Sequence, residues 1–171
     1  HFRYYCVAAD RGGPRSTEEA ATTIAILFEA ARVSRPRLQS MDILPLYASI
    51  LTLLYVGLSI RTLRLRRTLR IAIGDAGNVR MLRAMRAHSN FAEYVPLGLI
   101  VIYLVETLGA QPLLVHGLCV CLLLGRATHA FGVSRMKEDY RFRVSGMALT
   151  FTTLIVAAGW LLMASLRVSG A

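Results

Sequence analysis

Residues 83–105 read RAMRAHSNFAEYVPLGLIVIYLV, a polar stretch that runs directly into an apolar one. If the stretch is one helix, four polar side chains spaced three or four residues apart share one of its faces. They are Arg83, Arg86, Asn90 and Glu93. Polar groups in a membrane-embedded segment are costly, usually point into a helix bundle, and mark a functional site. The row therefore predicts a site for a small zwitterionic or anionic ligand.

The composition excludes an ordinary soluble domain. Of the 171 residues, 55% are hydrophobic, and the mean hydropathy of +0.50 is high for a soluble chain. The net charge of +10 is carried by 20 basic residues, all but one of them Arg, and most stand beside long apolar runs. That placement is typical of topology signals and of contacts to anionic membrane lipid. No finger or base-stacking motif accompanies the charge, so we expect no nucleic-acid partner.

Four apolar segments are long enough to cross a bilayer, since roughly 20 residues span its hydrocarbon core. We predict helices at residues 41–62, 79–108, 113–132 and 142–167. In the second helix we expect Pro96 to cause a kink. In the third, Gly117, Cys121 and Gly125 stand four residues apart and form a small-residue face that permits close packing. Short connections between four such helices predict an all-α fold, an integral membrane four-helix bundle.

Residues 1–40 differ from the rest of the chain. They hold six Arg, four acidic residues, a Gly-Gly-Pro turn and one possible short helix. They lack the long apolar stretch and cleavage site of a signal peptide. Met41 opens the first clean apolar segment and would be a natural start codon. We therefore expect residues 1–40 to be a disordered extension or a start-site artefact, with a surface amphipathic helix as the functional alternative, and residues 41–171 to form the membrane domain.

The charges of the connections predict the orientation in the membrane. The stretch from 61 to 86 holds eight Arg, the stretch from 126 to 143 holds five Lys or Arg, and the connection from 107 to 112 holds none. The positive-inside rule then places the two basic connections in the cytoplasm and both ends of the bundle outside. Compact connections fit a multi-pass protein of a bacterial inner membrane, and a membrane of the endoplasmic reticulum type fits equally well.

The third and fourth helices also carry charge at the basic end, namely Arg126, His129 and Arg143. An Arg fork suits carboxylates, and an Arg beside a thiol stabilises the thiolate. The structural alternative is that these arginines extend to the lipid head groups, as most arginines at the end of a membrane helix do. His88 lies about 200° around the helix from Arg86, so we expect it to face a second helix. The four His and three Cys show no metal-ligand spacing, and we expect no metal.

The motif RAHxNxxEYxP at residues 86–96, on the second of four membrane helices, resembles the MAPEG family, the membrane-associated proteins in eicosanoid and glutathione metabolism. That family includes microsomal glutathione transferases, leukotriene C synthase and microsomal prostaglandin E synthase. The motif GRxxH at residues 125–129 resembles the family's third helix. The resemblance covers residues from about 41 to 167.

This resemblance implies a homotrimer of four-helix subunits, with glutathione as co-substrate between adjacent subunits near the cytoplasmic face. It implies that Arg126 holds a glutathione carboxylate and that Arg143 is the catalytic residue, which stabilises the thiolate. The second substrate would be a lipophilic electrophile that enters from the bilayer. The residues implied to bind glutathione or to lie beside it are Arg83, Arg86, His88, Asn90, Glu93, Tyr94, Arg126 and His129.

The chain departs from the family pattern in two places. Several family enzymes carry a ligand-contacting Tyr one turn after the position of His129, and this chain has Val133 there. The connection before the fourth helix is longer than in the eukaryotic enzymes, which leaves Arg141 as an alternative to Arg143. The sequence thus favours a glutathione transferase-like enzyme that conjugates or reduces lipophilic electrophiles, with a non-catalytic membrane protein binding a lipid or glutathione as the alternative. A small channel or transporter is less favoured, because no internal repeat is visible.

Overall fold

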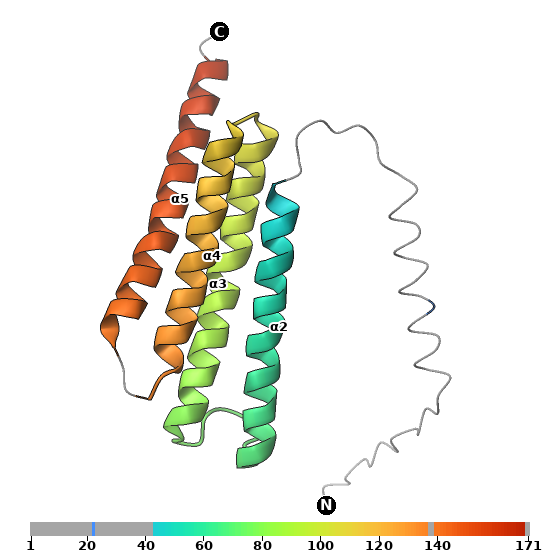
Figure 1. Cartoon of the computed structure of the whole chain (residues 1–171), viewed down its shortest axis with the longest axis vertical. Helices are drawn as coiled ribbons and strands as arrows, with labels where there is room; N and C mark the ends of the chain where they lie inside the picture. The colour runs from blue at the N-terminus through green and yellow to red at the C-terminus, as the bar shows by residue number, and fades with distance from the viewer. Residues whose placement is uncertain (1–21, 23–42, 137–138, 170–171) are drawn as a thin grey trace, which may run out of the picture. The chain divides into compact units, whose positions relative to one another are not determined.

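The computed structural model describes residue 22 and the ranges 43–136 and 139–169, so the predicted extension, residues 1–40, lies outside the described residues apart from Thr22. Within the two described ranges all regular secondary structure is α-helical, in four helices (Figure 1). They are α2 (Leu44–Leu69), α3 (Val79–Thr107), α4 (Pro112–Ser134) and α5 (Tyr140–Ser169). Each helix is long and apolar enough to cross a membrane. The predicted number and order of spans are therefore confirmed.

The first helix is longer than predicted, because it ends at Leu69 rather than at residue 62. Its last turns are rich in Arg, which favours helix and needs no apolar partner at a solvent-exposed position. Arg70 caps this end of the helix and adopts a left-handed conformation with φ 53°. Arg66 then reaches past this end, and its Nη1 donates to the carbonyl oxygens of Ala72 at 3.3 Å and Gly74 at 3.1 Å. This side chain fixes the connection to α3.

Residues 74–78 read GDAGN, a composition that predicts a turn, and the structure has a turn there, closed by the backbone N–H of Asn78 donating to the carbonyl oxygen of Asp75 at 2.9 Å. Gly74 and Gly77 take φ of 69° and 71°, which glycine adopts without steric cost. Asn78 caps α3, since its Oδ1 accepts from the backbone N–H of Met81 at 3.1 Å. The helix then runs through Pro96 and ends at Thr107. The position of the polar row on α3 follows from this fixed starting point.

The four helices lie side by side as an up-and-down bundle (Figure 1), in which α4 contacts α2, α3 and α5. Two glycines allow α4 and α5 to approach closely. A Cβ built on Gly146 would lie 2.7 Å from the carbonyl oxygen of Gly125 and 2.7 Å from the backbone nitrogen of His129. The sequence placed Gly117 on the same packing face as Gly125. In the structure Gly117 is exposed, and a Cβ built on it would have no atom within 4 Å. The close contact is therefore confined to the half of α4 that carries the charged residues.

The apolar core extends from the middle of the bundle to the end opposite the basic connections, with fully buried side chains that include Leu51 of α2, Ile102 of α3 and Leu122 of α4. At the end opposite the basic connections, next to the core residue Val105, Glu106 is also buried, whereas its place at the outer boundary of a membrane helix predicts a solvated side chain. Its Oε1 accepts from the backbone N–H of Ile43 at 3.3 Å. A carboxylate at this place satisfies an otherwise unpaired amide at the start of α2 and interacts favourably with the helix dipole.

Gly146→Ala is expected to lower the free energy of unfolding by about 1–3 kcal/mol, because the added methyl group overpacks the contact with the backbone of α4. Gly159→Ala is the matched control on the same helix, since a Cβ there meets nothing within 4 Å. The free energy of unfolding of both variants is measured by titration with a denaturing detergent in mixed micelles, followed by circular dichroism. Equal loss of stability in the two variants would contradict the close contact.

Candidate functional site

A pocket of about 390 Å³ opens at the basic end of the bundle, between α3, α4 and the start of α5. We refer to it as the polar pocket. It brings together predicted site residues that are far apart in the sequence. Its lining residues are Val79, Leu82, Arg83, Arg86, Ser89, Asn90, Glu93, His129, Val133 and Arg143. The predicted row of α3 thus forms one wall, and α4 and α5 contribute the opposite one.

The wall formed by α3 carries more cations than anions. Arg86 and Glu93 are exposed, whereas Arg83 and Asn90 are half-buried. The Nη1 of Arg83 donates to the carbonyl oxygen of Val133 at 3.3 Å, which links the first turns of α3 to the end of α4. Such a wall offers guanidinium donors to carboxylates and one carboxylate to an ammonium group. This combination suits a zwitterionic ligand with net negative charge.

Arg126 lies behind this wall and is only 1% exposed. Its Nη1 donates to the Oδ1 of Asn90 at 2.7 Å, and its Nε donates to the Oγ1 of Thr150 at 2.9 Å. The Nη2 lies 3.5 Å from the carbonyl oxygen of Gly146, and the guanidinium stands 5.1 Å from the centre of the Tyr94 ring. A buried guanidinium needs partners for its N–H groups, and α3 and α5 supply them here.

The contact with Arg126 determines how Asn90 faces a ligand. Because the side-chain oxygen of Asn90 accepts from the cation, the amide nitrogen remains as the donor. Asn90 lines the polar pocket, while Arg126 is not among the lining residues. In the single chain, Arg126 therefore positions Asn90. The sequence could not predict this contact, because the two residues are on different helices and local spacing does not determine how those helices are rotated against each other.

Two other predicted residues lie outside the polar pocket. The Tyr94 ring packs between Arg126 and Phe151, with ring centres 5.8 Å apart in the tyrosine–phenylalanine pair. His88 faces α2, as its angular offset from Arg86 predicted. The Nε2 of His88 lies 3.0 Å from the Oγ of Ser59, and its ring stacks on Tyr55 at 4.9 Å.

Arg143 and His129 stand where the polar pocket meets a second pocket. This second pocket has a volume of about 430 Å³ and lies between α4 and α5. We refer to it as the apolar pocket, because most of its lining is hydrophobic. It is lined by His129, Tyr140, Arg143, Val144, Met147, Ala148 and Phe151. The two side chains that the pockets share therefore separate a charged compartment from an apolar one.

The structure distinguishes the two arginines that the sequence left as alternatives. Arg143 lines both pockets. Arg141 is exposed and lines neither, and its backbone N–H donates to the Oδ1 of Asp139 at 3.0 Å. A close contact between the helices brings Arg143 to this position, since a Cβ on Gly132 would lie 3.2 Å from the Arg143 backbone nitrogen.

Sequence reasoning missed Gly146 and Thr150, which hold Arg126 from α5. The sequence does contain a signal for Thr150, because a hydroxyl inside an apolar helix can accept a hydrogen bond from a buried cation. That signal does not identify Arg126 as the partner. Among the residues that the structure describes, no three His, Cys, Asp or Glu side chains form a group that could hold a metal ion.

Comparison with known proteins gives two further findings. The family model described as the MAPEG family matches residues 44–163, which is more than half of the chain. The chain is also similar to the inner membrane protein YecN of Escherichia coli K12, with 35% identity over 111 residues that cover 65% of this chain and 83% of the relative. The protein of the same name from Escherichia coli O6:H1 matches with the same values. These names give a location and no activity.

Asn90→Leu is expected to destabilise the protein by about 2 kcal/mol, because it leaves a buried N–H of Arg126 without its acceptor. The double variant Asn90→Leu/Arg126→Leu is expected to be less destabilised than the sum of the two single variants, since the polar pair is removed together. Unfolding in a mixed detergent titration measures the three variants and the wild type. Strictly additive changes would show that the two side chains do not interact.

Proposed function

This chain belongs to the MAPEG family, and on that premise we propose that it is a membrane-embedded glutathione transferase-like enzyme. As a member of this family with four apolar helices, it is a multi-pass integral membrane protein. In the proposed reaction, glutathione thiolate conjugates or reduces a lipophilic electrophile. The observation that carries the proposal is that Arg143 and His129 line both a charged pocket and an apolar one.

The polar pocket has the groups that the tripeptide would need. Glutathione carries two carboxylates and one ammonium group. Glu93 would accept from the ammonium group, and Arg83 and Arg86 would donate to the carboxylates. The amide of Asn90, held by Arg126, would donate to the peptide. A volume of about 390 Å³ lies within the range of small-molecule sites.

Arg143 is the proposed catalytic residue. Its guanidinium would stabilise the thiolate that forms when the glutathione thiol gives its proton to solvent. The sulfur lone pair would then attack the electrophilic carbon, so that a carbon–sulfur bond forms and the leaving group departs with the electron pair of its own bond. The enzyme would accelerate this step by stabilising the nucleophile and by holding the two reactants together.

The apolar pocket would hold the second substrate. Its lining includes Val144, Ala148 and Phe151, all on α5. A lipophile dissolved in the bilayer would reach this pocket over the exposed face of α5, where Val144 is 66% and Phe151 44% exposed, without crossing water. It would meet the sulfur beside Arg143. The two compartments would therefore keep the peptide and the lipophile in different surroundings until their reacting atoms meet.

A homotrimer is part of the proposal. Arg86 and Glu93 are exposed in the single chain, although we propose that both hold glutathione. A neighbouring subunit over this wall would exclude water, which strengthens the contacts between these side chains and a charged ligand. The trimer would then complete the pocket rather than only stabilise the bundle.

The alternative is a non-catalytic membrane protein that binds a lipid or glutathione. It is favoured by Val133, which lines the polar pocket where several family enzymes carry a ligand-contacting Tyr. Without that hydroxyl, the thiolate would depend on Arg143 alone. A protein that binds glutathione without ionising its thiol would fit this alternative.

Glutathione titration of the full chain in detergent, followed by ultraviolet absorbance of the thiolate, tests the proposal. The wild type should give a saturable thiolate signal, and Arg143→Ala should lose it and lower kcat/KM toward a lipophilic electrophile by about 100-fold or more. Glu93→Gln should weaken glutathione binding by about tenfold, equivalent to about 1.4 kcal/mol.

Arg141→Ala is the control, because it removes a nearby exposed arginine that lines neither pocket. It should retain the signal of the wild type. A well-folded wild type that binds no glutathione would remove the transferase proposal. Binding without a thiolate signal would instead support the non-catalytic alternative.

A further inference from the structure

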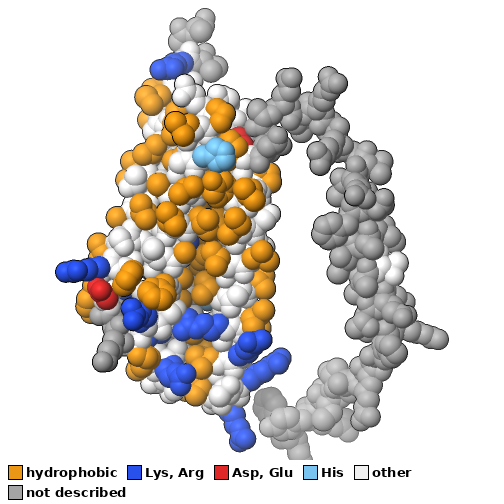
Figure 2. Space-filling model, in the orientation of Figure 1, with side chains coloured by type: hydrophobic (Ala, Val, Ile, Leu, Met, Phe, Trp, Pro, Cys, Tyr) orange, Lys and Arg blue, Asp and Glu red, His pale blue; other side chains and the backbone are white. Residues whose placement is uncertain are grey.

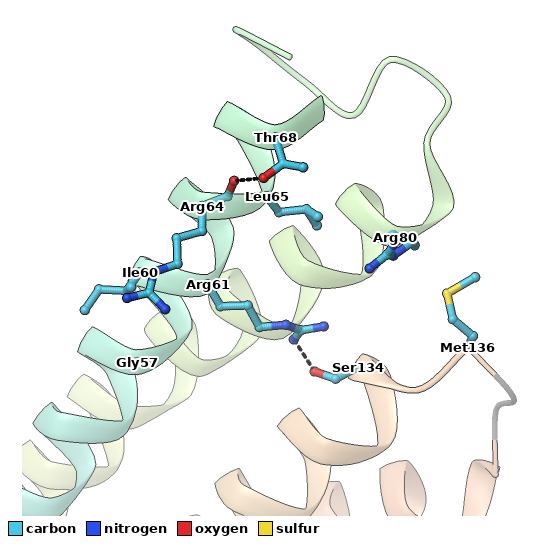
Figure 3. A pocket seen from close by; sticks show the side chains of 9 residues that line it. All are labelled: Gly57, Ile60, Arg61, Arg64, Leu65, Thr68, Arg80, Ser134 and Met136. Carbon is cyan, nitrogen blue, oxygen red and sulfur yellow. Dashed lines mark hydrogen bonds between the residues drawn. The ribbon is translucent and has the colours of Figure 1, made fainter. Parts of the chain in front are cut away.

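A third pocket, with a volume of about 740 Å³, lies at the basic end of the bundle (Figure 3). We refer to it as the arginine pocket. It is formed by α2, the first turn of α3 and the end of α4, and it shares no lining residue with the polar or the apolar pocket. Its polar lining consists of Arg61, Arg64, Thr68, Arg80 and Ser134. The proposed glutathione site leaves these residues without a role.

The charge of the arginine pocket is uncompensated by its own lining, which contains three arginines and no acidic residue. Arg61 extends from α2 toward α4 and donates to the Oγ of Ser134, and Arg80 projects from α3 beside it (Figure 3). The Ser134 hydroxyl, which accepts from Arg61, still has its own hydrogen to donate. An anion with several oxygens is the ligand that such forks and hydroxyls hold.

Arg66 is an arginine of the same region whose role is to support the fold. It donates to the connection between α2 and α3 through the carbonyl oxygens of Ala72 and Gly74. Within the described part of the chain, the guanidinium groups of Arg64 and Arg80 make no such hydrogen bond to the connection. Their placement in the arginine pocket is therefore not explained by support of the fold.

An apolar track leads from the membrane-embedded part of α2 to the arginine pocket. Leu53, Gly57, Ile60 and Arg64 follow one another at spacings of four, three and four residues, so they lie along one helix face. Leu53 is 73% exposed, and a Cβ built on Gly57 would meet nothing within 4 Å. Figure 2 shows that hydrophobic side chains cover the middle of the bundle and that most Lys and Arg side chains gather at one end.

We propose that the arginine pocket binds the phosphate group of an anionic phospholipid. The phosphate oxygens would contact Arg61, Arg64 and Arg80, and one acyl chain would lie along the open track over Gly57 and Leu53. The apolar track favours a lipid over a free phosphate ion, because a free ion would gain nothing from exposed hydrophobic residues on the membrane side. The lipid would join α2 to α3 and α4 at the end of the bundle where α2 has few buried residues.

Native mass spectrometry of the full chain tests this inference, after purification in neutral detergent micelles that contain phosphatidylglycerol or phosphatidylcholine. Phosphatidylglycerol should be retained and should raise the Tm, whereas phosphatidylcholine should not. Arg64→Gln/Arg80→Gln should reduce the retained phosphatidylglycerol about tenfold. Arg67→Gln/Arg135→Gln is the matched control, because both arginines are exposed, lie at the same end and are outside the pocket.

Gly57→Leu tests the acyl track separately from the charges. It should weaken phosphatidylglycerol retention and leave any binding of inorganic phosphate unchanged. Equal loss in the charge-matched control would overturn the proposal, since it would show only a general attraction to anionic lipid. Saturable binding of inorganic phosphate without lipid retention would also overturn it, and so would displacement of the lipid by glutathione, which would assign the pocket to the proposed enzyme site.

Discussion

The buried guanidinium of Arg126 is the constraint on which the rest of the structure depends. A cation inside a membrane bundle is stable only if its N–H groups find acceptors, and bulk water is not available to supply them. Asn90 of α3 and Thr150 of α5 provide oxygens at 2.7 and 2.9 Å. These contacts fix the rotation and the axial position of α3 and α5 against α4, and the contact between Gly125 and Gly146 allows the helices to come close enough.

The same rotation and axial position of the helices place the residues of the site that we propose. His129 follows Arg126 by three residues on α4, so burial of the one directs the other toward α5. On α5, Arg143 precedes Gly146 by three residues and comes to the same interface. The two pockets meet at His129 and Arg143 because of these spacings. Chemistry at the junction would thus follow from a packing requirement deeper in the bundle.

Arginine has three different roles at this end of the molecule, and burial separates them. Arg126 is almost completely buried and organises the helix interface. Arg66 is half-buried and fixes the connection between α2 and α3. The arginines that line the pockets remain partly or fully accessible, which suits the binding of anions. One residue type can serve all three roles because the guanidinium is always charged and has five donors in a fixed geometry.

The sequence by itself determined the four spans, the turn at residues 74–78 and the polar face of α3, since all of these depend on residues close together in the chain. Only the tertiary structure decided that His88 contacts Ser59, that Glu106 is buried, and that Arg143 rather than Arg141 lines the pockets. These outcomes depend on how each helix is rotated against its neighbours. That rotation is set by contacts between distant residues, such as Arg126 with Asn90 and Thr150, and no local spacing contains this information.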